Sequence, residues 1–217
     1  MSKNFIQRNR TKRYAIADIH GCLHTFSTLI REKIKLSKED QLFLLGDYVH
    51  RGPNSEGVLE EIRKLILQGY QIYPIRGNHE DKYLKQMGDK IAPKHKELIA
   101  SMPYYYETED FIFVHAGLNF SIENPFEDTN TMKWGMGFNM EPDPKFLKGR
   151  SIVHGHTITA LSDIFDAVMD RAVYIPIDNG CYRGLVYEEV AYGTLVAVDL
   201  DNMKMIVQEN VDSNYSE

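Results

Sequence analysis

Five short loops carry side chains that could bind a metal ion, and each follows a predicted buried strand. The loops are ADIHG (Asp18, His20), GDYVHRG (Asp47), RGNHE (Asn78, His79), VHAG (His115) and VHGHT (His154, His156). In α/β sheets ligands bind beyond the carboxyl ends of strands, so these loops can converge on one site. Each loop alone has an ordinary explanation, such as a helix cap at Asp18 or a turn at Asn78. Because five such loops follow one another, we expect a shared site.

The types of donor group indicate a catalytic metal centre. The candidate ligands are carboxylates, imidazoles and an amide oxygen, without a thiolate, and this set suits Mn²⁺, Fe or Zn²⁺ better than a structural zinc site. They outnumber the ligands that a single four-coordinate ion needs. Two ions about 3.5–4 Å apart that share one carboxylate would use all of them. We therefore expect two divalent metal ions, with Mn²⁺ as the first choice and Fe or Zn²⁺ as alternatives.

The spacing of apolar residues predicts the elements that position these loops. Helices are predicted over residues 22–35 and 55–68, and a polar helical stretch runs from the RGNHE loop to about Met102. Residues 118–150, around Trp134, predict an irregular loop. Strands are predicted at 14–17, 41–45, 71–75, 111–114 and 151–153, and again at 173–177, 193–199 and 203–208. Strands that alternate with helices, followed by strands alone, indicate an α/β layered domain completed by a second sheet.

Composition narrows the class of protein. The chain has 217 residues, 43% of them hydrophobic, so we expect a single domain over residues 1–217 in which residues 1–12 form a loose tail. The formal net charge of −6 argues against nucleic acid as a partner. The two cysteines fit a reducing compartment, and the N-terminal stretch lacks an apolar signal region. No apolar run approaches the roughly 20 residues that span a bilayer. We expect a cytoplasmic protein without a membrane partner.

The ordered motif set resembles a known family. ADIHG, GDYVHRG, RGNHE, VHAG and VHGHT resemble the phosphoprotein phosphatase branch of the calcineurin-like metallophosphoesterases. This branch includes bacterial and phage serine/threonine protein phosphatases and the symmetrical dinucleoside tetraphosphatases. The resemblance runs from Asp18 to about Cys181, where IDNGC is similar to a turn that lies behind the family's site. It implies an α/β fold, the four-layer α-β-β-α sandwich.

The resemblance also implies roles for individual residues. His79 would be the general acid, and Arg51 and Arg76 would bind the substrate phosphate. The implied metal ligands are Asp18 and His20 for the first ion, Asp47 as the bridge, and Asn78, His115 and His156 for the second ion.

The implied reaction is the hydrolysis of a phosphate ester by a hydroxide that bridges the two ions and attacks phosphorus directly. Metal coordination lowers the pKa of water from about 15.7 toward neutrality, and arginine forks stabilise the equatorial oxygens. We expect a serine/threonine protein phosphatase, or one of dual specificity, which acts on phosphoproteins or small phosphoesters. The alternatives are a symmetrical dinucleoside tetraphosphatase, whose members usually carry longer insertions, and a phosphate-binding module with impaired catalysis.

Two positions depart from the family pattern. His50 stands where the GDxVDRG motif has an acidic residue, and it would either lower the pKa of the acid His79 or point to solvent as an ordinary loop residue. The arginine that many members place after the Trp-containing loop has no clear equivalent, and Lys133 or Arg150 could substitute for it. The first departure bears on proton donation and the second on phosphate affinity.

Overall fold

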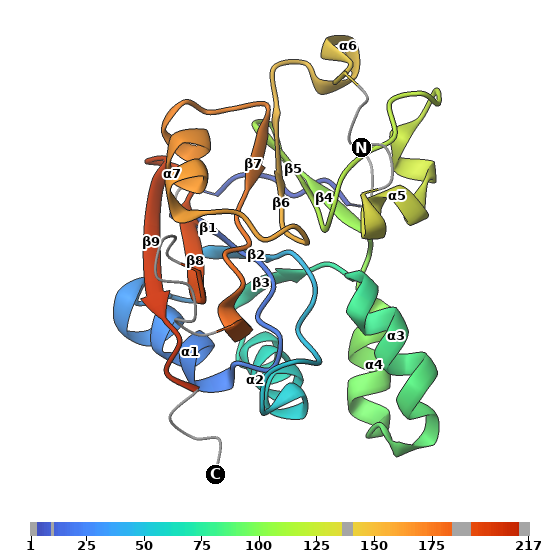
Figure 1. The fold of residues 1–217 in the computed structure, drawn as a ribbon, viewed down its shortest axis with the longest axis vertical. Helices are drawn as coiled ribbons and strands as arrows, with labels where there is room; N and C mark the ends of the chain where they lie inside the picture. The colour runs from blue at the N-terminus through green and yellow to red at the C-terminus, as the bar shows by residue number, and fades with distance from the viewer. Residues whose placement is uncertain (1–3, 10, 136–140, 184–191, 213–217) are drawn as a thin grey trace.

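The computed structural model describes residues 4–9, 11–135, 141–183 and 192–212, and their strands form two sheets (Figure 1). The first sheet has the order β3-β2-β1-β8-β9, and the second has the order β4-β5-β6-β7. The strands are β1 Arg13–Ile16, β2 Gln41–Leu44, β3 Gln71–Pro74, β4 Tyr105–Glu107, β5 Phe111–Val114, β6 Ser151–His154, β7 Tyr174–Pro176, β8 Thr194–Asp199 and β9 Lys204–Glu209. The strands predicted before the five loops are β1, β2, β3, β5 and β6.

The central strands are buried on both faces, which explains why they read as continuous apolar runs. On β2, Leu42 and Leu44 pack in the cluster that contains the helices of the first layer, whereas Phe43 packs in the cluster between the sheets. Phe43 stacks on Phe113 of β5, with ring centroids 4.0 Å apart. The neighbour of Phe113, Ile112, belongs to a third cluster on the outer face of the second sheet. Each strand therefore joins two layers of the core.

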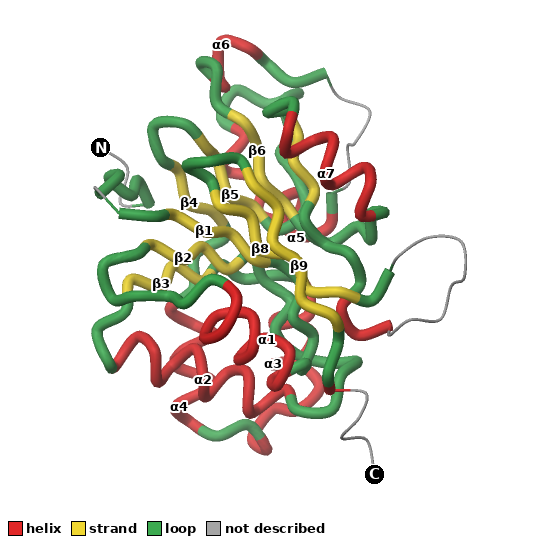
Figure 2. Tube along the Cα trace, turned by 90° about the vertical axis from the view of Figure 1, so that its left-hand side faces the viewer, coloured by secondary structure: helices red, strands yellow, loops and turns green. Residues whose placement is uncertain are grey.

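Helices cover the outer faces of both sheets (Figure 2). Helices α1 (Leu23–Thr28) and α2 (Ser55–Leu67) supply apolar side chains to the core of the first sheet. Helices α5 (Thr129–Trp134) and α6 (Pro144–Leu147) contribute Met132 and Leu147 to the cluster on the outer face of the second sheet. The order helix, sheet, sheet, helix confirms the predicted four-layer sandwich.

The strand directions bring the five loops to one place. β1, β2 and β3 run parallel, and so do β5, β6 and β7. Backbone hydrogen bonds join loops within a sheet, from the amide of His20 to the carbonyl of Asp47 and from the amide of Gly155 to the carbonyl of His115 (both 2.8 Å). The amide of His156 donates to Asp18 Oδ2 at 3.0 Å and joins the two sheets. The loops therefore meet at the carboxyl ends of both sheets.

The last two strands join the first sheet, whereas the sequence predicted that late strands would complete the second. β8 pairs antiparallel with β1, and β9 pairs antiparallel with β8. All six residues of β8 are buried, because core layers pack on both faces of the strand. The second sheet is instead completed by β4, which the sequence analysis missed because its three residues are only half-buried and show no clear alternation.

The helices also differ in detail from those predicted. The polar helical stretch is broken into α3 (Asn78–Met87), a 3₁₀ turn (Gly88–Lys90) and α4 (Pro93–Ser101). Gly88 has a φ of 48°, and a proline opens the next helix, so the break follows ordinary helix-stop chemistry. The helix predicted over 22–35 is α1 followed by a wider π-helical turn (Leu29–Lys33). Helix α7 (Leu161–Met169), which packs on β7 and β9, was not predicted.

The N-terminal tail contacts the second sheet. Of the N-terminal tail, residues 4–9 are described, and the amide of Ile6 donates to the carbonyl of Glu107 on β4 at 2.8 Å. Residues 1–3 and 10 lie outside the described residues. That the whole chain is a single domain stays a prediction. In the part of the chain that the structure describes, no helix combines the length and apolar character needed to cross a bilayer.

A buried carboxylate fixes two of the loops to each other. Glu80, at 0% exposure, accepts hydrogen bonds from the amides of Asp47 and Tyr48, at 2.9 and 2.8 Å. It also accepts one from the amide of Gly77 at 2.9 Å. The loop after β2 is thus held against the loop after β3 by one side chain on the first turn of α3.

Replacement of Glu80 should destabilise the fold. Glu80→Ala leaves three buried amides without this acceptor, and each orphaned group costs about 1–3 kcal/mol. We expect a loss of about 3 kcal/mol or more in the free energy of unfolding, measured by urea denaturation. Glu80→Gln, which keeps one acceptor oxygen, should lose less. The exposed Glu97→Ala on α4 is the matched control, and an Ala variant at position 80 as stable as this control would contradict the role assigned to Glu80.

Candidate metal centre

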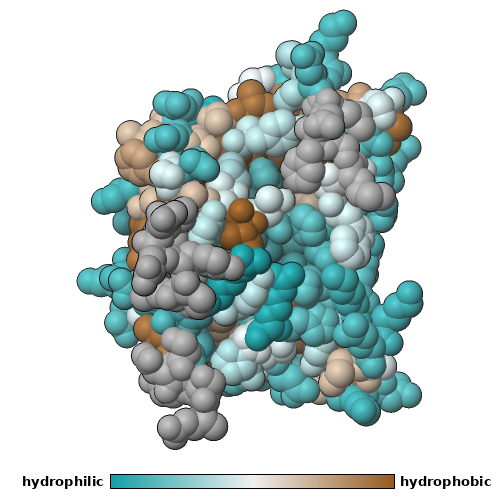
Figure 3. Space-filling view, in the orientation of Figure 1, coloured by the Kyte–Doolittle hydropathy of each residue, from teal (hydrophilic) through white to brown (hydrophobic). Residues whose placement is uncertain are grey.

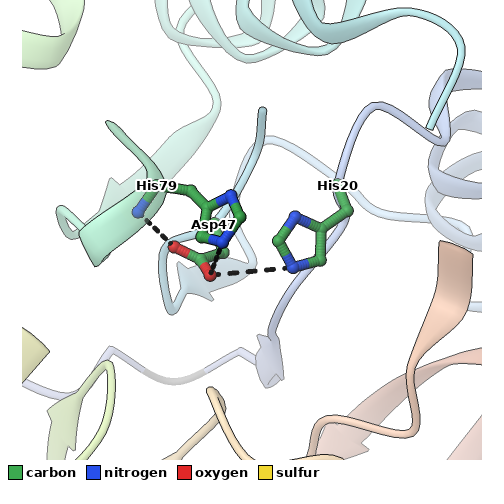
Figure 4. A group of neighbouring side chains, drawn as sticks. All are labelled: His20, Asp47 and His79. Atoms are coloured by element: carbon green, nitrogen blue, oxygen red, sulfur yellow. Dashed lines mark hydrogen bonds and ion pairs between the residues drawn. The ribbon is translucent and has the colours of Figure 1, made fainter. Parts of the chain in front are cut away.

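Asp47 lies at the centre of the converging loops, and its two carboxylate oxygens face different partners. Oδ2 lies 3.6 Å from His20 Nε2 and 3.9 Å from His79 Nε2 (Figure 4). Oδ1 lies 3.4 Å from His115 Nε2 and accepts a hydrogen bond from the amide of His79 at 2.9 Å. One buried carboxylate therefore contacts side chains from both sheets.

Two groups of side chains could each hold a metal ion, and they share Asp47. The first group is His20, Asp47 and His79, and the second is Asp47, His115 and His156, with the ligand atoms of each group within 4.8 Å of one another. Asn78 extends the second group, because its Oδ1 lies 3.0 Å from His115 Nε2. A carboxylate common to both groups is the arrangement that a bridging ligand requires.

The first group differs from the expected ligand set in one member. The sequence analysis placed Asp18 in it and gave His79 the role of general acid. Asp18 Oδ1 lies 3.9 Å from His20 Nε2, next to the group. This oxygen is buried and has no hydrogen-bond partner among the described residues. Since an orphaned buried carboxylate oxygen is costly, a cation beside Asp18 would satisfy it, and the donor set as a whole fits divalent ions.

Backbone carbonyls orient two of the imidazoles. His20 Nδ1 lies 3.0 Å from the carbonyl oxygen of Val49, and His115 Nδ1 lies 2.8 Å from that of Leu45. A carbonyl can only accept, so each Nδ1 carries a proton, and in the neutral ring Nε2 is the nitrogen whose lone pair can bind a metal ion. This is the tautomer that metal coordination through Nε2 needs.

The loop backbone is tightly constrained around these side chains. Left-handed φ angles occur at Asp18 (51°), His20 (47°), Asp47 (55°), His50 (68°), Arg51 (70°) and His156 (70°). Such angles are uncommon outside glycine, although Asp and His adopt them more readily than bulky residues, and they cluster at functional sites. The absence of a side chain also matters, since a Cβ on Gly155 would lie 1.9 Å from Asp18 Oδ2.

Charges in the centre are strongly coupled. Burial alone would raise the pKa of Asp47, but His115, His20 and His79 hold it well below its usual range. Burial disfavours the charged form of His115, yet Asp47 outweighs it and raises the pKa of His115 to about 10. Burial, together with Asp178, raises the pKa of Asp18. Asp47 and His115 therefore each favour the charged form of the other, and a metal ion bound at His115 Nε2 would take the place of a proton.

The remaining imidazoles are kept neutral. Burial is the main cause that lowers the pKa of His20 and His156 to about 4 and that of His79 to about 3. Neutral imidazole is the form that binds a metal. His154, the last residue of β6, lies outside both groups, and its Nδ1 is 3.1 Å from the carbonyl oxygen of Gly155.

His50 contacts the residue expected to be the acid. Its Nδ1 lies 3.0 Å from His79 Nδ1, so the two rings share a hydrogen bond in which one nitrogen donates and the other accepts. His50 therefore does not simply point to solvent. An imidazole occupies the place where the family resemblance implies a carboxylate next to His79.

The two arginines expected to bind phosphate lie in different surroundings. Arg51 reaches toward the centre, with a terminal guanidinium nitrogen 3.5 Å from His79 Nε2. Arg76 donates to the carbonyl of Ile99 at 2.8 Å and to Asp81 at 3.3 Å, and neither partner belongs to the ligand groups. Lys133 pairs with Asp81, and Arg150 pairs with Glu107 at 2.8 Å.

Aromatic and basic residues border the ligands; the sequence analysis had considered Trp134 for the pocket but missed Tyr182 and Lys82. Tyr182 packs edge-on against His20, and Trp134 packs edge-on against His156. Lys82 lies over the Trp134 ring. The sequence signal for Lys82 is its position one helical turn after His79, which puts both on the same face of α3. Figure 3 shows that the surface over α3 is hydrophilic.

Comparison with known proteins now identifies the family. A family model for the calcineurin-like phosphoesterases matches residues 11–160, a range that contains all five loops. The chain belongs to the calcineurin-like phosphoesterase family. The predicted family is thereby confirmed, and the chain is a member of a hydrolase family whose chemistry is the cleavage of phosphoesters.

Several curated proteins similar to this chain are symmetrical bis(5'-nucleosyl)-tetraphosphatases. The symmetrical bis(5'-nucleosyl)-tetraphosphatase of Vibrio campbellii is 33% identical over 122 residues, which cover 49% of this chain and 44% of that protein. The chain spans less than half the length of the curated relatives it matches.

Solved structures share the fold of this calcineurin-like phosphoesterase. A candidate diadenosine tetraphosphatase superposes with a TM-score of 0.65 at 21% identity, over 94% of this chain and 96% of that one. A protein serine/threonine phosphatase from Saccharomyces cerevisiae gives 0.64 at 17% identity, over 95% and 83%. At these identities the likeness extends to the fold alone.

Removal of the shared carboxylate should disturb both ligand groups. We predict that Mn²⁺-saturated wild-type protein binds two ions per chain and that Asp47→Asn binds fewer than one, with kcat/KM reduced about 100-fold or more. Metal analysis after gel filtration and circular dichroism measure ion content and folding. Asp89→Asn on the surface turn after α3 is the matched control. A wild-type chain that saturates at one ion would contradict a two-ion centre.

The contact between His50 and His79 predicts a pH effect. His50→Asp would place a carboxylate beside His79, and a negative charge raises the pKa of a histidine. Because His79 would keep its proton to higher pH, the alkaline limb of kcat/KM should move upward. The gain should be larger for phosphoserine, whose alkoxide needs the proton, than for p-nitrophenyl phosphate. Profiles that superimpose for wild type and variant would leave His50 without influence on the acid.

Proposed function

We propose that this chain is a metal-dependent phosphohydrolase that cleaves dinucleoside tetraphosphates symmetrically. The observation that carries the proposal is the convergence of two ligand groups on the shared Asp47, in a chain of the calcineurin-like phosphoesterase family. The choice of substrate is supported by the relative from Vibrio campbellii, which is a symmetrical tetraphosphatase. The sequence analysis preferred phosphoproteins because the chain is compact. The curated relatives support its alternative better.

The surroundings of His79 also favour an anhydride substrate. Burial, with Lys82, His20 and Arg51, lowers the pKa of His79 to about 3, and His50 adds no negative charge. Because His50 contacts His79 where the resemblance implies a carboxylate, the protonated form of His79 is less favoured. The leaving group of a protein phosphatase reaction is an alkoxide that needs a proton, whereas a leaving nucleoside diphosphate is a phosphate whose last pKa is about 6. An anhydride therefore demands less of this acid.

The residues of the centre have distinct tasks in the proposed reaction. Asp18, His20, Asp47, Asn78, His115 and His156 would hold two divalent ions. When bound, such ions lower the pKa of water and neutralise phosphate charge. Arg51, beside His79, would bind an oxygen of the scissile phosphate through its planar fork. Water would add to phosphorus and lose a proton as the phosphorus–oxygen bond to the leaving group breaks, and His79 would hydrogen-bond the departing oxygen.

A substrate comparison tests the proposal. We expect the Mn²⁺-loaded chain to convert diadenosine tetraphosphate into two molecules of ADP, with kcat/KM at least about tenfold above that for phosphoserine or phosphotyrosine peptides. Chromatography of the nucleotides distinguishes this from cleavage into AMP and ATP. The Asp47→Asn variant controls for contaminating activity. Faster hydrolysis of the peptides would favour a protein phosphatase, and two bound ions without activity on either class would refute both assignments.

A further inference from the structure

Two cations lie over aromatic rings on different sides of the ligand groups. The guanidinium carbon of Arg51 lies 4.4 Å from the centroid of the Tyr182 ring, and that ring packs edge-on against His20 at 5.1 Å. The Lys82 ammonium lies 4.6 Å from the centroid of the Trp134 ring, and that ring packs edge-on against His156 at 6.2 Å. His20 belongs to the first ligand group and His156 to the second, so each group has one such cation beside it.

Lys82 lies on the same face of α3 as His79. It follows His79 by three residues, about one helical turn, and its side chain is half-buried. The side chain therefore starts from the side of α3 that carries the candidate acid.

The other cations considered for this role, Arg76, Lys133 and Arg150, are each engaged with a carboxylate. Asp81 pairs with both Arg76 and Lys133, and Glu107 pairs with Arg150. Among the described residues, no carboxylate lies within ion-pair distance of Lys82, which has the Trp134 ring as its recorded contact. The Trp134 ring holds the ammonium in place without neutralising it. The charge of Lys82 is therefore not offset by a carboxylate among the described residues, and it can attract an anion.

We propose that Lys82 is a substrate-binding residue whose ammonium contacts a phosphate oxygen on the His156 side of the centre. This inference rests on the proposed function, since it needs a phosphate-bearing substrate. It assigns to Lys82, on α3, the second cation that the sequence analysis sought in Arg76, Lys133 or Arg150. Arg51 and Lys82 would then bind the substrate from two sides of the two-metal centre.

Inorganic phosphate provides a probe that does not depend on turnover. For the Mn²⁺-loaded full-length chain, we expect Lys82→Gln to weaken phosphate binding about tenfold in calorimetric titration, as loss of one charge-assisted contact predicts. KM for diadenosine tetraphosphate should rise by a similar factor. Lys82→Arg should recover part of the affinity. Lys85→Gln, one turn further along α3 and exposed, is the matched control, and ion content should equal that of wild type in all three variants.

The outcomes separate this inference from the proposed function. A phosphate Kd for Lys82→Gln within twofold of wild type, with two ions bound, would overturn the role of Lys82. So would an equal loss in Lys85→Gln, because it would indicate a diffuse effect of charge. A wild-type chain that binds phosphate through Lys82 but leaves diadenosine tetraphosphate intact would refute the proposed substrate and support the phosphate-binding role of Lys82. A wild-type chain that does not bind phosphate would refute the inference itself.

Discussion

The buried carboxylate of Glu80 accepts three backbone hydrogen bonds, and the geometry of the centre depends on them. Two come from Asp47 and Tyr48 after β2 and one comes from Gly77 after β3. Asp47 is held in turn, since its Oδ1 accepts the amide of His79. Because Asp47 contacts imidazoles from both sheets, a shift of these loops would separate the two ligand groups. The arrangement is preorganised before any ligand is present, as an electrostatic centre requires.

The surroundings shift the pKa values of Asp47 and Asp18 in opposite directions. Asp47 is ionised because three histidines surround it, whereas burial and a neighbouring acid raise the pKa of Asp18. The same environment holds His79 neutral, through burial and the nearby Lys82. The contact between His50 and His79 departs from the pattern that the motifs resemble, because an imidazole stands where that pattern has a carboxylate.

The site was more predictable from the sequence than the sheet order was. Loops such as ADIHG and RGNHE combine glycine with ligand-type residues directly after apolar strands, and this local pattern predicted their convergence. The partner of β8 could not be predicted, because a strand buried on both faces carries no alternation that says which sheet it joins. Contacts between elements that are far apart in the sequence could not be predicted either. Trp134 and Lys82 are 52 residues apart, and only the fold shows that the ammonium lies over the ring.

The two sheets contribute different ligands to the centre, so bound ions would connect them. Loops of the first sheet carry Asp18, His20, Asp47 and Asn78, and loops of the second carry His115 and His156. Direct contacts already join the two sets of loops, such as the hydrogen bond from the amide of His156 to Asp18 and the contact of His115 Nδ1 with the carbonyl of Leu45. Ions bound at the centre would act as non-covalent cross-links between the halves of the core. Because ions that bind only the folded chain stabilise it, the free energy of unfolding would rise with the concentration of the metal ion.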